Sequence, residues 1–469
     1  MVAIPLASKT DPAKREVVTQ ERLVNLYASR SPSGARSEFY LTRTPGLTAW
    51  SRNSSDICRG LFDADGYGLG AFGSTLFRFN TSGGATSVSG SISGTRDLRC
   101  SQNNASPRET AIVTGGTAYQ YNGTNLTAIS GDLPANPIDT ICVNGITLML
   151  FANRKVFYSP VNDADSYNAL NFFTVPGTGE LRAGMELGNQ IVFWGQDDFY
   201  IFRHVADDAD EPFQLVQGAS KPFGCINTFA NCNVGGLVCF VDQYGVPRVL
   251  GQGYLPESIG TEGVQADIDA LSDKSVIRLW GYVSGDRGFL VLWTPEFCRV
   301  YDFKEKRWHS RISYQRNTWQ AKYYMRFAER DLVSPDQSGG VFFLDDNAFT
   351  EDGGHIVWDV VCPPLTNFPG GGSIYTVDLD IEVGTALGAS AALADQEPRI
   401  AMSLSLDGGK TFKTGRVASL GGRGQWRKRV TWNRCGSFGR EGVVFKFSGS
   451  AGVPHAIMNL SAEITKRAG

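Results

Sequence analysis

The sequence predicts an all-β protein, and three observations support this prediction. The chain of 469 residues contains 54 glycines, and only 19% of its residues are charged. Few of its segments have the long amphipathic period of a helix. Short apolar runs separated by glycine-rich turns recur instead, as expected for antiparallel strands. The chain is too long for one small core, so we expect two or three domains.

A repeated unit predicts the architecture of the main body. From about residue 61, an apolar run, a turn and a second short run with an aromatic residue recur. The copies span residues 66–80, 110–123, 145–159, 188–204, 235–251, 287–303 and 339–353. Their spacing of roughly 35–50 residues is the period of a propeller blade, and each copy would form one hairpin of a four-stranded blade. We therefore expect a β-propeller-like body of six or seven blades over residues 51–362. Stacked sandwiches or barrels are the alternative, because short strands at regular spacing occur in both.

Two further parts flank this body. Residues 1–50 are predicted to form an extended N-terminal strap, with a turn at Pro45-Gly46. A linker rich in proline and glycine covers residues 363–372 and interrupts the blade pattern. Residues 373–469 follow it as a C-terminal module, in which alternating apolar residues and tight turns predict a β-sandwich.

A single stretch has the pattern of a helix, from Glu262 to Leu271. Thr261 is its expected N-cap. Val264, Ile268 and Leu271 recur at helical spacing and should share one buried face.

One motif of the C-terminal module is typical of a known turn. Its residues, Ser405, Asp407, Gly409, Thr411 and Phe412, match the Asp-box of sialidases. The glycines supply left-handed backbone positions, and the polar side chains can bond the turn backbone. We interpret the motif as a structural turn that sets the hairpin register. A sialidase would also need an arginine cluster and a tyrosine nucleophile, and nothing in the sequence gathers them.

The densest basic segment runs from Arg423 to Arg434 and is predicted to be a strand. The period of two would place Trp426 and Trp432 on one face, and Arg427 and Arg429 on the other. Arginines beside large aromatics are typical of interface cores, so these four residues are the candidate interface. Three alternatives remain for this segment: a solvated sheet face, a surface for an acidic protein, or a surface for DNA.

The sequence predicts no catalytic residues, no metal site and no cofactor. Nine cysteines are scattered without a Cys-x-x-Cys motif, and Cys225, Cys232 and Cys239 lack the clustered histidine of a zinc site. The acidic run 207–211 lacks the glycine and ligand spacing of a calcium loop. We expect no nucleophile elbow, no phosphate loop and no dinucleotide-binding unit. A net charge of −3 gives no global field for nucleic acid. We expect no signal peptide and no membrane anchor.

Several short motifs follow one another along nearly the whole chain. They are Asn25-Leu26-Tyr27, Thr44-Pro45-Gly46-Leu47, Lys155–Ser159 before Asp163-Ala164-Asp165, the strand Ile191–Phe202 with Trp194-Gly195, Phe223-Gly224-Cys225, the segment Pro256–Ile268, Val300-Tyr301-Asp302 leading to Trp308-His309, the turn Ser405–Gly408, Arg429–Gly436 and Val444–Phe447. In this order they resemble the tail hub, or nozzle, proteins of short-tailed bacteriophages (podoviruses). These proteins are also described as packaged-DNA stabilisation proteins.

The resemblance implies a structural virion protein, synthesised in the cytoplasm of the bacterial host, without enzymatic activity. It implies a homohexameric ring below the portal and its adaptor ring. Such a ring retains packaged double-stranded DNA, conducts it through the lumen during ejection without tight binding, and seats a tailspike or tail-fibre protein and a tail needle or tip protein. The alternative is a glycan-active propeller with a sialidase-like Asp-box, or a propeller that binds glycan or protein without catalysis.

Overall fold

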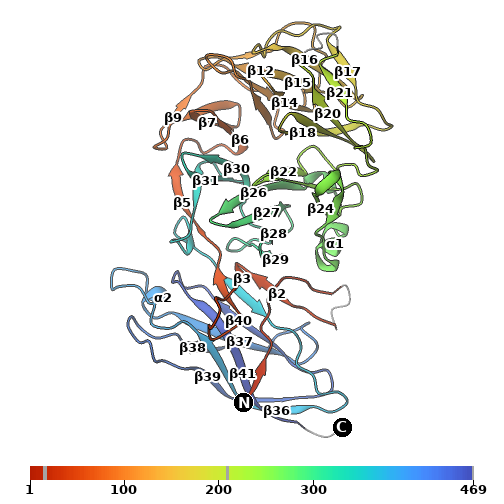
Figure 1. Ribbon diagram of the computed structural model, residues 1–469. Coiled ribbons are helices and arrows are strands. Elements are labelled where there is room, and N and C mark those ends of the chain that lie inside the picture. The colour runs from red at the N-terminus through yellow and green to blue at the C-terminus, as the bar shows by residue number, and fades with distance from the viewer. Residues whose placement is uncertain (14–17, 207–210, 467–469) are drawn as a thin grey trace.

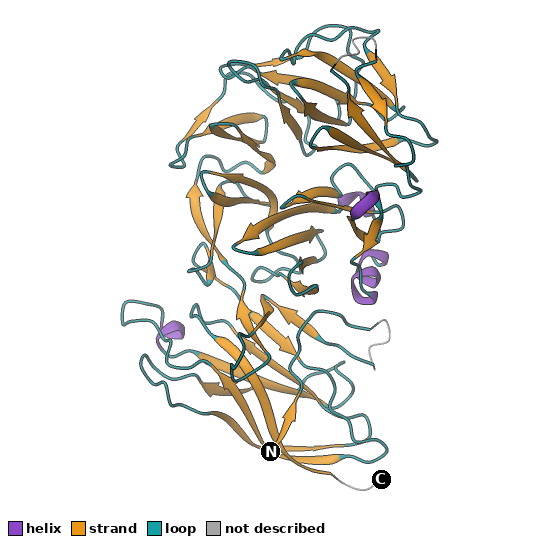
Figure 2. Cartoon of the chain, viewed as in Figure 1, coloured by secondary structure: helices purple, strands orange, loops and turns teal. Residues whose placement is uncertain are grey.

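The computed structural model of the chain describes residues 1–13, 18–206 and 211–466. Strands dominate these residues (Figure 2), so the prediction of an all-β protein is confirmed. A β-propeller occupies the upper part of Figure 1, and a β-sandwich that carries both chain ends occupies the lower part.

The described residues form a propeller of seven antiparallel blades, and each blade is built from four strands. Blade one contains β6 (Cys58–Ala64), β7 (Tyr67–Phe72), β8 (Thr75–Phe79) and β9 (Ala85–Ser87). Blade two contains β10 (Arg99–Gln102), β11 (Thr110–Val113), β12 (Ala118–Tyr121) and β13 (Leu126–Ala128). Blade three contains β14 (Asp139–Val143), β15 (Ile146–Leu150), β16 (Lys155–Val161) and β17 (Phe172–Thr174). Blade four contains β18 (Leu181–Leu187), β19 (Gln190–Gly195), β20 (Phe199–His204) and β21 (Phe213–Leu215).

The remaining blades complete the circle. Blade five contains β22 (Asn231–Val234), β23 (Leu237–Val241), β24 (Pro247–Leu250) and β25 (Pro256–Ser258). Blade six contains β26 (Arg278–Ser284), β27 (Arg287–Trp293), β28 (Cys298–Asp302) and β29 (Arg307–Ser310). Blade seven contains β30 (Ala321–Phe327), β31 (Arg330–Pro335), β32 (Val341–Asp345) and β5 (Gly46–Ser51), extended by the short β33 (Thr350–Glu351) and β34 (Gly354–His355). The first strand of each blade faces the axis, since β10 packs on β14, β14 on β18, β22 on β26 and β30 on β6.

Blade seven is closed by a strand from the other end of the chain. β5 precedes blade one, yet it pairs with β32 in a register from Ser51 opposite Val341 to Gly46 opposite Asp345. The ring is therefore fastened by main-chain hydrogen bonds between its two ends. This pairing removes the open sheet edges that an unclosed circle would leave.

The repeated unit of the sequence corresponds to the two middle strands of a blade. Copies 66–80, 110–123 and 145–159 coincide with the hairpins β7–β8, β11–β12 and β15–β16. Middle strands are covered on both faces, so β7 and β15 are buried along their whole length and appear as apolar runs. The outer strands are short and partly exposed, as in β9, and give no such signal. The last copy, 339–353, contains β32 but misses β31, whose sequence begins with two charged residues.

The β-sandwich consists of two sheets around one core. The first sheet has the order β3 (Leu26–Arg30), β4 (Phe39–Arg43), β41 (Ala456–Lys466), β36 (Gly372–Ile381) and β39 (Val430–Phe438), with β1 (Val2–Ile4) on β41. The second has the order β2 (Arg22–Val24), β35 (Trp358–Val361), β40 (Val444–Gly449), β37 (Arg399–Ser405) and β38 (Arg416–Ser419). Trp358, Val377, Trp432 and Phe445 are among the buried side chains between them.

The two units share main-chain pairing. β2 pairs with β35 of the sandwich and, through Val24 opposite Ser310, with β29 of blade six. One nine-stranded sheet therefore runs from the propeller axis into the sandwich. Residues 1–50, expected to be a strap, supply β1 to β4 to the sandwich and the start of β5 to the propeller. The expected linker at 363–372 joins β35 to β36, so the sandwich already begins at Trp358.

Helices are few and short. α1 (Glu262–Asp269) lies within the predicted helix, with Thr261 as its N-cap and Val264 and Ile268 buried, so this prediction is confirmed. α2 (Leu393–Gln396) and the single 3-10 turns η1 (Gln252–Tyr254) and η2 (Lys274–Val276) were not predicted, because one turn carries no helical period. Within residues 1–13, 18–206 and 211–466, no helix has the length and apolar character needed to cross a membrane.

Candidate functional site

Charged side chains meet at the propeller axis. Asp97, two residues before β10 in blade two, accepts hydrogen bonds from Arg278 Nε at 2.8 Å and Lys322 Nζ at 2.9 Å. The hydroxyl of Tyr323 donates a third at 2.6 Å. These donors belong to blades six and seven, so the bonds run across the axis. Burial by itself raises the pKa of Asp97, but the positive charges of Arg278 and Lys322 outweigh it and hold the pKa below its ordinary value.

A second set of bonds joins the other inner strands. Arg99 of β10 donates from Nε to Asp139 of β14 at 2.9 Å, and from Nη2 to Asn231 of β22 at 3.0 Å. The other carboxylate oxygen of Asp139 accepts the backbone N–H of Gly184 in β18 at 3.1 Å. Together with the contacts of Asp97, these bonds form an axial plug that links the inner strands of blades two to seven.

A cavity of about 410 Å³ lies beside the plug, along β6, β10, β14 and β18. Two of the residues that line it are charged, Arg99 and Glu186. Arg99 is already bound to Asp139. Burial raises the pKa of Glu186. The cavity thus lies next to the plug, along the inner strands of four blades.

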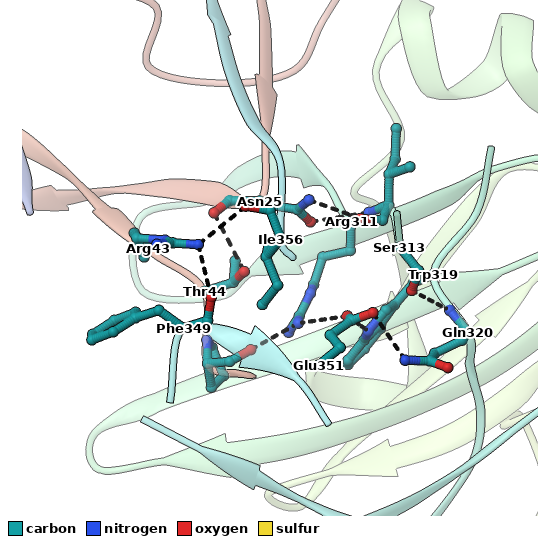
Figure 3. Close-up of polar contacts among 12 residues, drawn as sticks. Asn25, Arg43, Thr44, Arg311, Ser313, Trp319, Gln320, Phe349, Glu351 and Ile356 are labelled. Atoms are coloured by element: carbon teal, nitrogen blue, oxygen red, sulfur yellow. Dashed lines mark hydrogen bonds and ion pairs between the residues drawn. The ribbon is translucent and has the colours of Figure 1, made fainter. Parts of the chain in front are cut away.

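Asn25, the first residue of the motif Asn25-Leu26-Tyr27, lies where the propeller meets the sandwich (Figure 3). Asn25 separates β2 from β3 with a left-handed φ of 55°, which lets the chain pass from one sandwich sheet to the other. Its side-chain Nδ2 donates to the carbonyls of Ile312 at 2.8 Å and Val357 at 2.7 Å, and its Oδ1 accepts Ile312 N–H at 3.0 Å. One buried side chain therefore ties the N-terminal strands to both units.

Arg311 extends this junction toward blade seven (Figure 3). Its guanidinium is fully buried, stacks 3.7 Å from the ring centre of Trp319 and donates to the Pro45 carbonyl at 2.8 Å. Glu351 lies 3.9 Å from it and accepts Trp319 Nε1 at 2.8 Å and Gln320 Nε2 at 2.9 Å. The charge of Arg311 is thus balanced by a carboxylate that also holds the connection between blades six and seven.

Arg43, at the end of β4, supplies the sandwich side of the junction. Its Nη1 donates to the carbonyls of Ala451 at 2.5 Å and Val453 at 3.2 Å. Its Nη2 donates at 3.2 Å to the carbonyls of both Phe349 and Ile356. Burial lowers the pKa of Arg43 to about 10, so the side chain stays charged near pH 7.

Gly46, in the second motif of the strap, is needed for close approach. A side chain at this position would overlap the backbone oxygens of Ala348 and Thr350. The motifs that carried the family resemblance near the N-terminus are therefore structural, since they build the junction and the ring closure.

The residues of the predicted structural turn bond one another. Ser405 Oγ donates to Asp407 Oδ1 at 2.6 Å and accepts Gly409 N–H at 2.8 Å. Asp407 also accepts the N–H of Thr411 at 3.0 Å and its hydroxyl at 2.5 Å, and Phe412 is half-buried. The hydrogen bonds from Ser405 and Thr411 hold the pKa of Asp407 well below its ordinary value. This carboxylate is fully engaged in its own turn.

The predicted strand from Arg423 to Arg434 is wrong for its first half. β39 begins only at Val430, and residues 420–429 form turns in which Gly421 and Gly424 have positive φ values of 89° and 83°. Glycine-rich sequence supports such turns better than an extended strand. The alternation from Trp426 to Trp432 therefore does not exist.

The four residues of the candidate interface therefore do not share one surface, because one is buried and three are exposed. Trp432 is 3% exposed in the sandwich core, whereas Trp426 is 64% exposed. Arg427 and Arg429 are both exposed, but only Arg429 has a carboxylate partner among the described residues, Asp378 at 3.4 Å. Trp432 stabilises the monomer and is not available to a partner.

Other candidate ligands stay apart. Among the described residues, no group of three or more His, Cys, Asp or Glu side chains is arranged to hold a metal ion. All nine cysteines are free thiols, and burial raises the pKa of Cys225 to about 12. Burial also lowers the pKa of His309 and His455 to about 3, so both imidazoles are neutral near pH 7. Most of the acidic run, residues 207–210, lies outside the described residues.

Sequence reasoning missed the axial plug and the junction. A signal for the plug exists, because Arg99, Asp139, Asn231 and Arg278 each occupy the first position of an inner strand. A search for polar residues at one fixed position of every blade would have found them. The junction has no such period, and its residues are far apart in the sequence.

Comparison with known proteins agrees with this architecture. A family model described as the β-propeller of bacteriophage P22 Gp10 matches residues 2–348, and one described as its β-sandwich matches residues 358–465. Proteins of this family, which combine a propeller with a sandwich, are structural components of a phage tail and hence of the virion. The chain belongs to the family of P22 Gp10, the tail hub or nozzle stabilisation proteins of podoviruses. The first family match includes β1 to β4, which pair within the sandwich.

Solved structures resemble the chain only loosely. Virginiamycin B lyase from Staphylococcus aureus has 10% identity and a TM-score of 0.43, over 64% of this chain and 98% of that one. The extracellular domain of the hybrid two-component system BT3049 from B. thetaiotaomicron has 10% identity and a TM-score of 0.45, over 81% and 48%. The WD40 propeller of Doa1 has 9% identity and a TM-score of 0.40, over 64% and 96%. No curated protein sequence matches the chain.

Proposed function

We propose that six copies of the chain form the tail hub or nozzle ring below the portal and its adaptor. The ring retains packaged double-stranded DNA and conducts it during ejection through a lumen between the subunits. It also seats tailspikes or fibres and the tail needle or tip. A head-to-tail contact that closes by rotation generates such a ring from one kind of subunit.

The axial plug is the observation that supports a lumen between the subunits. Opposite walls of the propeller are joined there by hydrogen bonds of 2.8–3.0 Å, which Arg278 donates to Asp97 and Arg99 donates to Asn231. A duplex cannot pass a channel closed in this way without breaking the propeller. The conduit is therefore formed by several subunits, and a net charge of −3 per chain keeps it from binding DNA too tightly.

The role proposed here requires no substrate turnover. Asp97 and Asp139 at the axis are bound by Arg278 and Arg99, and Asp407 of the Asp-box bonds its own turn. A general acid or nucleophile needs a group that is free to reach a substrate. This argues for a structural protein and against a sialidase-like hydrolase.

Electron microscopy of assembled tails tests the proposal. We expect six propellers in a ring below the adaptor, with DNA density between subunits. Native mass spectrometry should give a hexamer, or a monomer that assembles when the adaptor is added. DNA density along a propeller axis, a stable monomer in finished tails, or cleavage of lipopolysaccharide or sialosides that a single carboxylate substitution abolishes would contradict it.

A further inference from the structure

Positive charge is concentrated in one part of the sandwich. Between Gly408 and Arg440 the sequence contains nine Lys and Arg residues and neither Asp nor Glu. The rest of the chain holds the remaining 35 basic residues against 47 acidic ones, a net charge of −12. A mildly acidic protein thus has one strongly basic segment.

The fold brings these charges to one edge of the sandwich. β38 and β39 lie side by side there, because Trp432 Nε1 donates to the Arg416 carbonyl at 2.8 Å and Arg416 Nη1 donates to the Arg434 carbonyl at 3.4 Å. The turns of residues 420–429 connect the two strands. We define the basic edge as the exposed cations of this unit that lack an ion pair within the described residues, together with the exposed Trp426: Arg416, Arg423, Trp426, Arg427, Lys428 and Arg434.

No carboxylate neutralises the basic edge within the described part of the chain. Its five cations form no ion pair with any described residue, whereas the neighbouring Arg429 and Arg440 bind Asp378 and Glu441. Clustered like charges repel one another, which lowers stability unless a partner compensates them. The uncompensated positive charge of the basic edge therefore favours binding of a polyanion.

Trp426 stands among these cations in a fixed position. The turn is bound by the Gly424 N–H, which donates to the Gly384 carbonyl at 3.0 Å. The indole packs so closely on Gly384 that a side chain there would overlap it. Aromatic side chains among Lys and Arg are typical of nucleic-acid-binding surfaces. Because the bases of a duplex are stacked, the indole would lie against the sugar–phosphate backbone.

We infer that the basic edge binds the phosphate backbone of double-stranded DNA, without reading its sequence. The inference rests on the proposed function, because it names the part of the ring that grips the packaged DNA. An acidic protein would fit the charge, but the fully buried core of a protein interface is more apolar than this edge. The large apolar side chains exposed on this unit are Trp426 and Val417.

The expected strength suits a grip that can be released. Each phosphate neutralised by a cation contributes about 0.9 to the slope of log affinity against log salt, and such sequence-independent binding has a Kd of roughly 10⁻⁴–10⁻⁶ M at physiological salt. A ring of several subunits would multiply these weak contacts along one duplex. DNA could then be retained in the finished particle and still slide during ejection.

Fluorescence anisotropy with a short labelled duplex, over about 50–200 mM salt, tests the inference on the full chain. The triple variant Arg423→Gln, Arg427→Gln, Lys428→Gln should reduce the salt slope by about 2.7, because three phosphate contacts are lost. The matched control removes three exposed cations of other regions that likewise lack an ion pair within the described residues, Arg30→Gln, Arg203→Gln and Arg330→Gln. It should leave the slope near that of the wild type, and all proteins should have the same circular dichroism spectrum and melting temperature.

Three outcomes would overturn the inference. The first is that the edge variant binds the duplex like the wild type or loses no more than the control. The second is that polyglutamate of matched charge binds the edge at least as tightly as the duplex, which would assign the edge to an acidic protein. The third is that the edge variant binds DNA normally but no longer assembles into tails, which would make the edge a subunit interface. Tail assembly of the edge variant with weakened DNA binding supports the inference, and a failure of the wild type to form a ring tests the proposed function separately.

Discussion

The propeller and the sandwich are both built from antiparallel sheets, but they differ in how far apart in the sequence their paired strands lie. In the propeller, each blade is made almost entirely from consecutive strands, such as β6 to β9 or β14 to β17. In the sandwich, β4 pairs with β41 and β2 pairs with β35, so the two ends of the chain meet. The propeller is a set of local hairpins, whereas the sandwich depends on contacts between residues separated by hundreds of positions.

This difference determines when each unit can form. Forming a local hairpin costs little loop-closure entropy, whereas pairing distant segments costs more entropy and is slower. The propeller can form most of its blades as soon as their residues are available. The sandwich needs both termini, and its completion also holds β5 near blade seven through Arg43 and Asn25.

The largest expected effect comes from separating the two units at the closing strand. A fragment of residues 46–357 retains β5 and should fold into a closed propeller with cooperative thermal unfolding. A fragment of residues 52–357 lacks β5, so blade seven loses the strand that pairs with β32 and the circle should remain open. Circular dichroism and limited proteolysis of the two fragments measure this difference.

The sandwich provides the converse experiment. A fragment of residues 358–466 contains β35 to β41 but lacks the N-terminal strands that pair with β35 and β41. It should stay unfolded alone and gain β structure when a peptide of residues 1–45 is added. A fragment 358–466 that folds without the peptide, or a stable closed propeller from 52–357, would show that the two units do not differ in this way.

The same difference explains how much of the architecture could be predicted. The middle hairpins of the blades have an apolar pattern that repeats in sequence, so the propeller was found from residues such as 66–80 and 188–204 alone. The pairing of Leu41 with Ile457 leaves no trace in either segment. The strap, the linker and the C-terminal module therefore emerged as separate parts, although the first 45 residues complete the last module.

The functional sites show the same contrast between local and non-local contacts. The turn Ser405–Phe412 is local, and its residue types at fixed spacing were enough to predict a structural role. The junction is non-local, since Asn25 binds Ile312 and Val357, and no spacing rule connects these residues. The pair Trp426 and Trp432 shows a third case, in which a period-two pattern was assumed across glycines that turn the chain. Burial in the tertiary fold then placed one tryptophan in the core and the other in solvent.

A second, smaller effect is expected at the junction itself. Asn25→Ala removes three hydrogen bonds of a buried side chain and leaves the backbone groups of Ile312 and Val357 without partners, a loss of roughly 2–4 kcal/mol in the free energy of unfolding. Because Asn25 ties the N-terminal strands to both units, the variant should also split one thermal transition into two. Differential scanning calorimetry of the wild type and variant measures both quantities.

Asn25→Gly is the matched control for this variant. Glycine accepts the φ of 55° without strain, so it removes the hydrogen bonds but keeps the backbone conformation. It should be more stable than Asn25→Ala by about 1 kcal/mol, the typical cost of a left-handed residue with a side chain. Equal stability of wild type and Asn25→Ala would show that the propeller and sandwich are coupled through other contacts, such as those of Arg43 and Arg311.

The smallest effect is expected at the local turn. Asp407→Asn replaces the exposed carboxylate that accepts the N–H and hydroxyl of Thr411. Since hydrogen bonds from Ser405 and Thr411 hold the pKa of Asp407 below its ordinary 3.8, the carboxylate stabilises the fold above that pH and ceases to do so as the pH falls. The melting temperature of the variant should therefore be only slightly below that of the wild type at pH 7, and the two should converge on acidification. Amide hydrogen exchange should speed up at Gly409 and Thr411 while the core strands of both units stay protected. If Asp407→Asn lowered stability as much as Asn25→Ala, or if the difference grew as the pH fell, the turn would be coupled to the distant contacts of the sandwich, and the contrast between local and non-local elements would fail at this site.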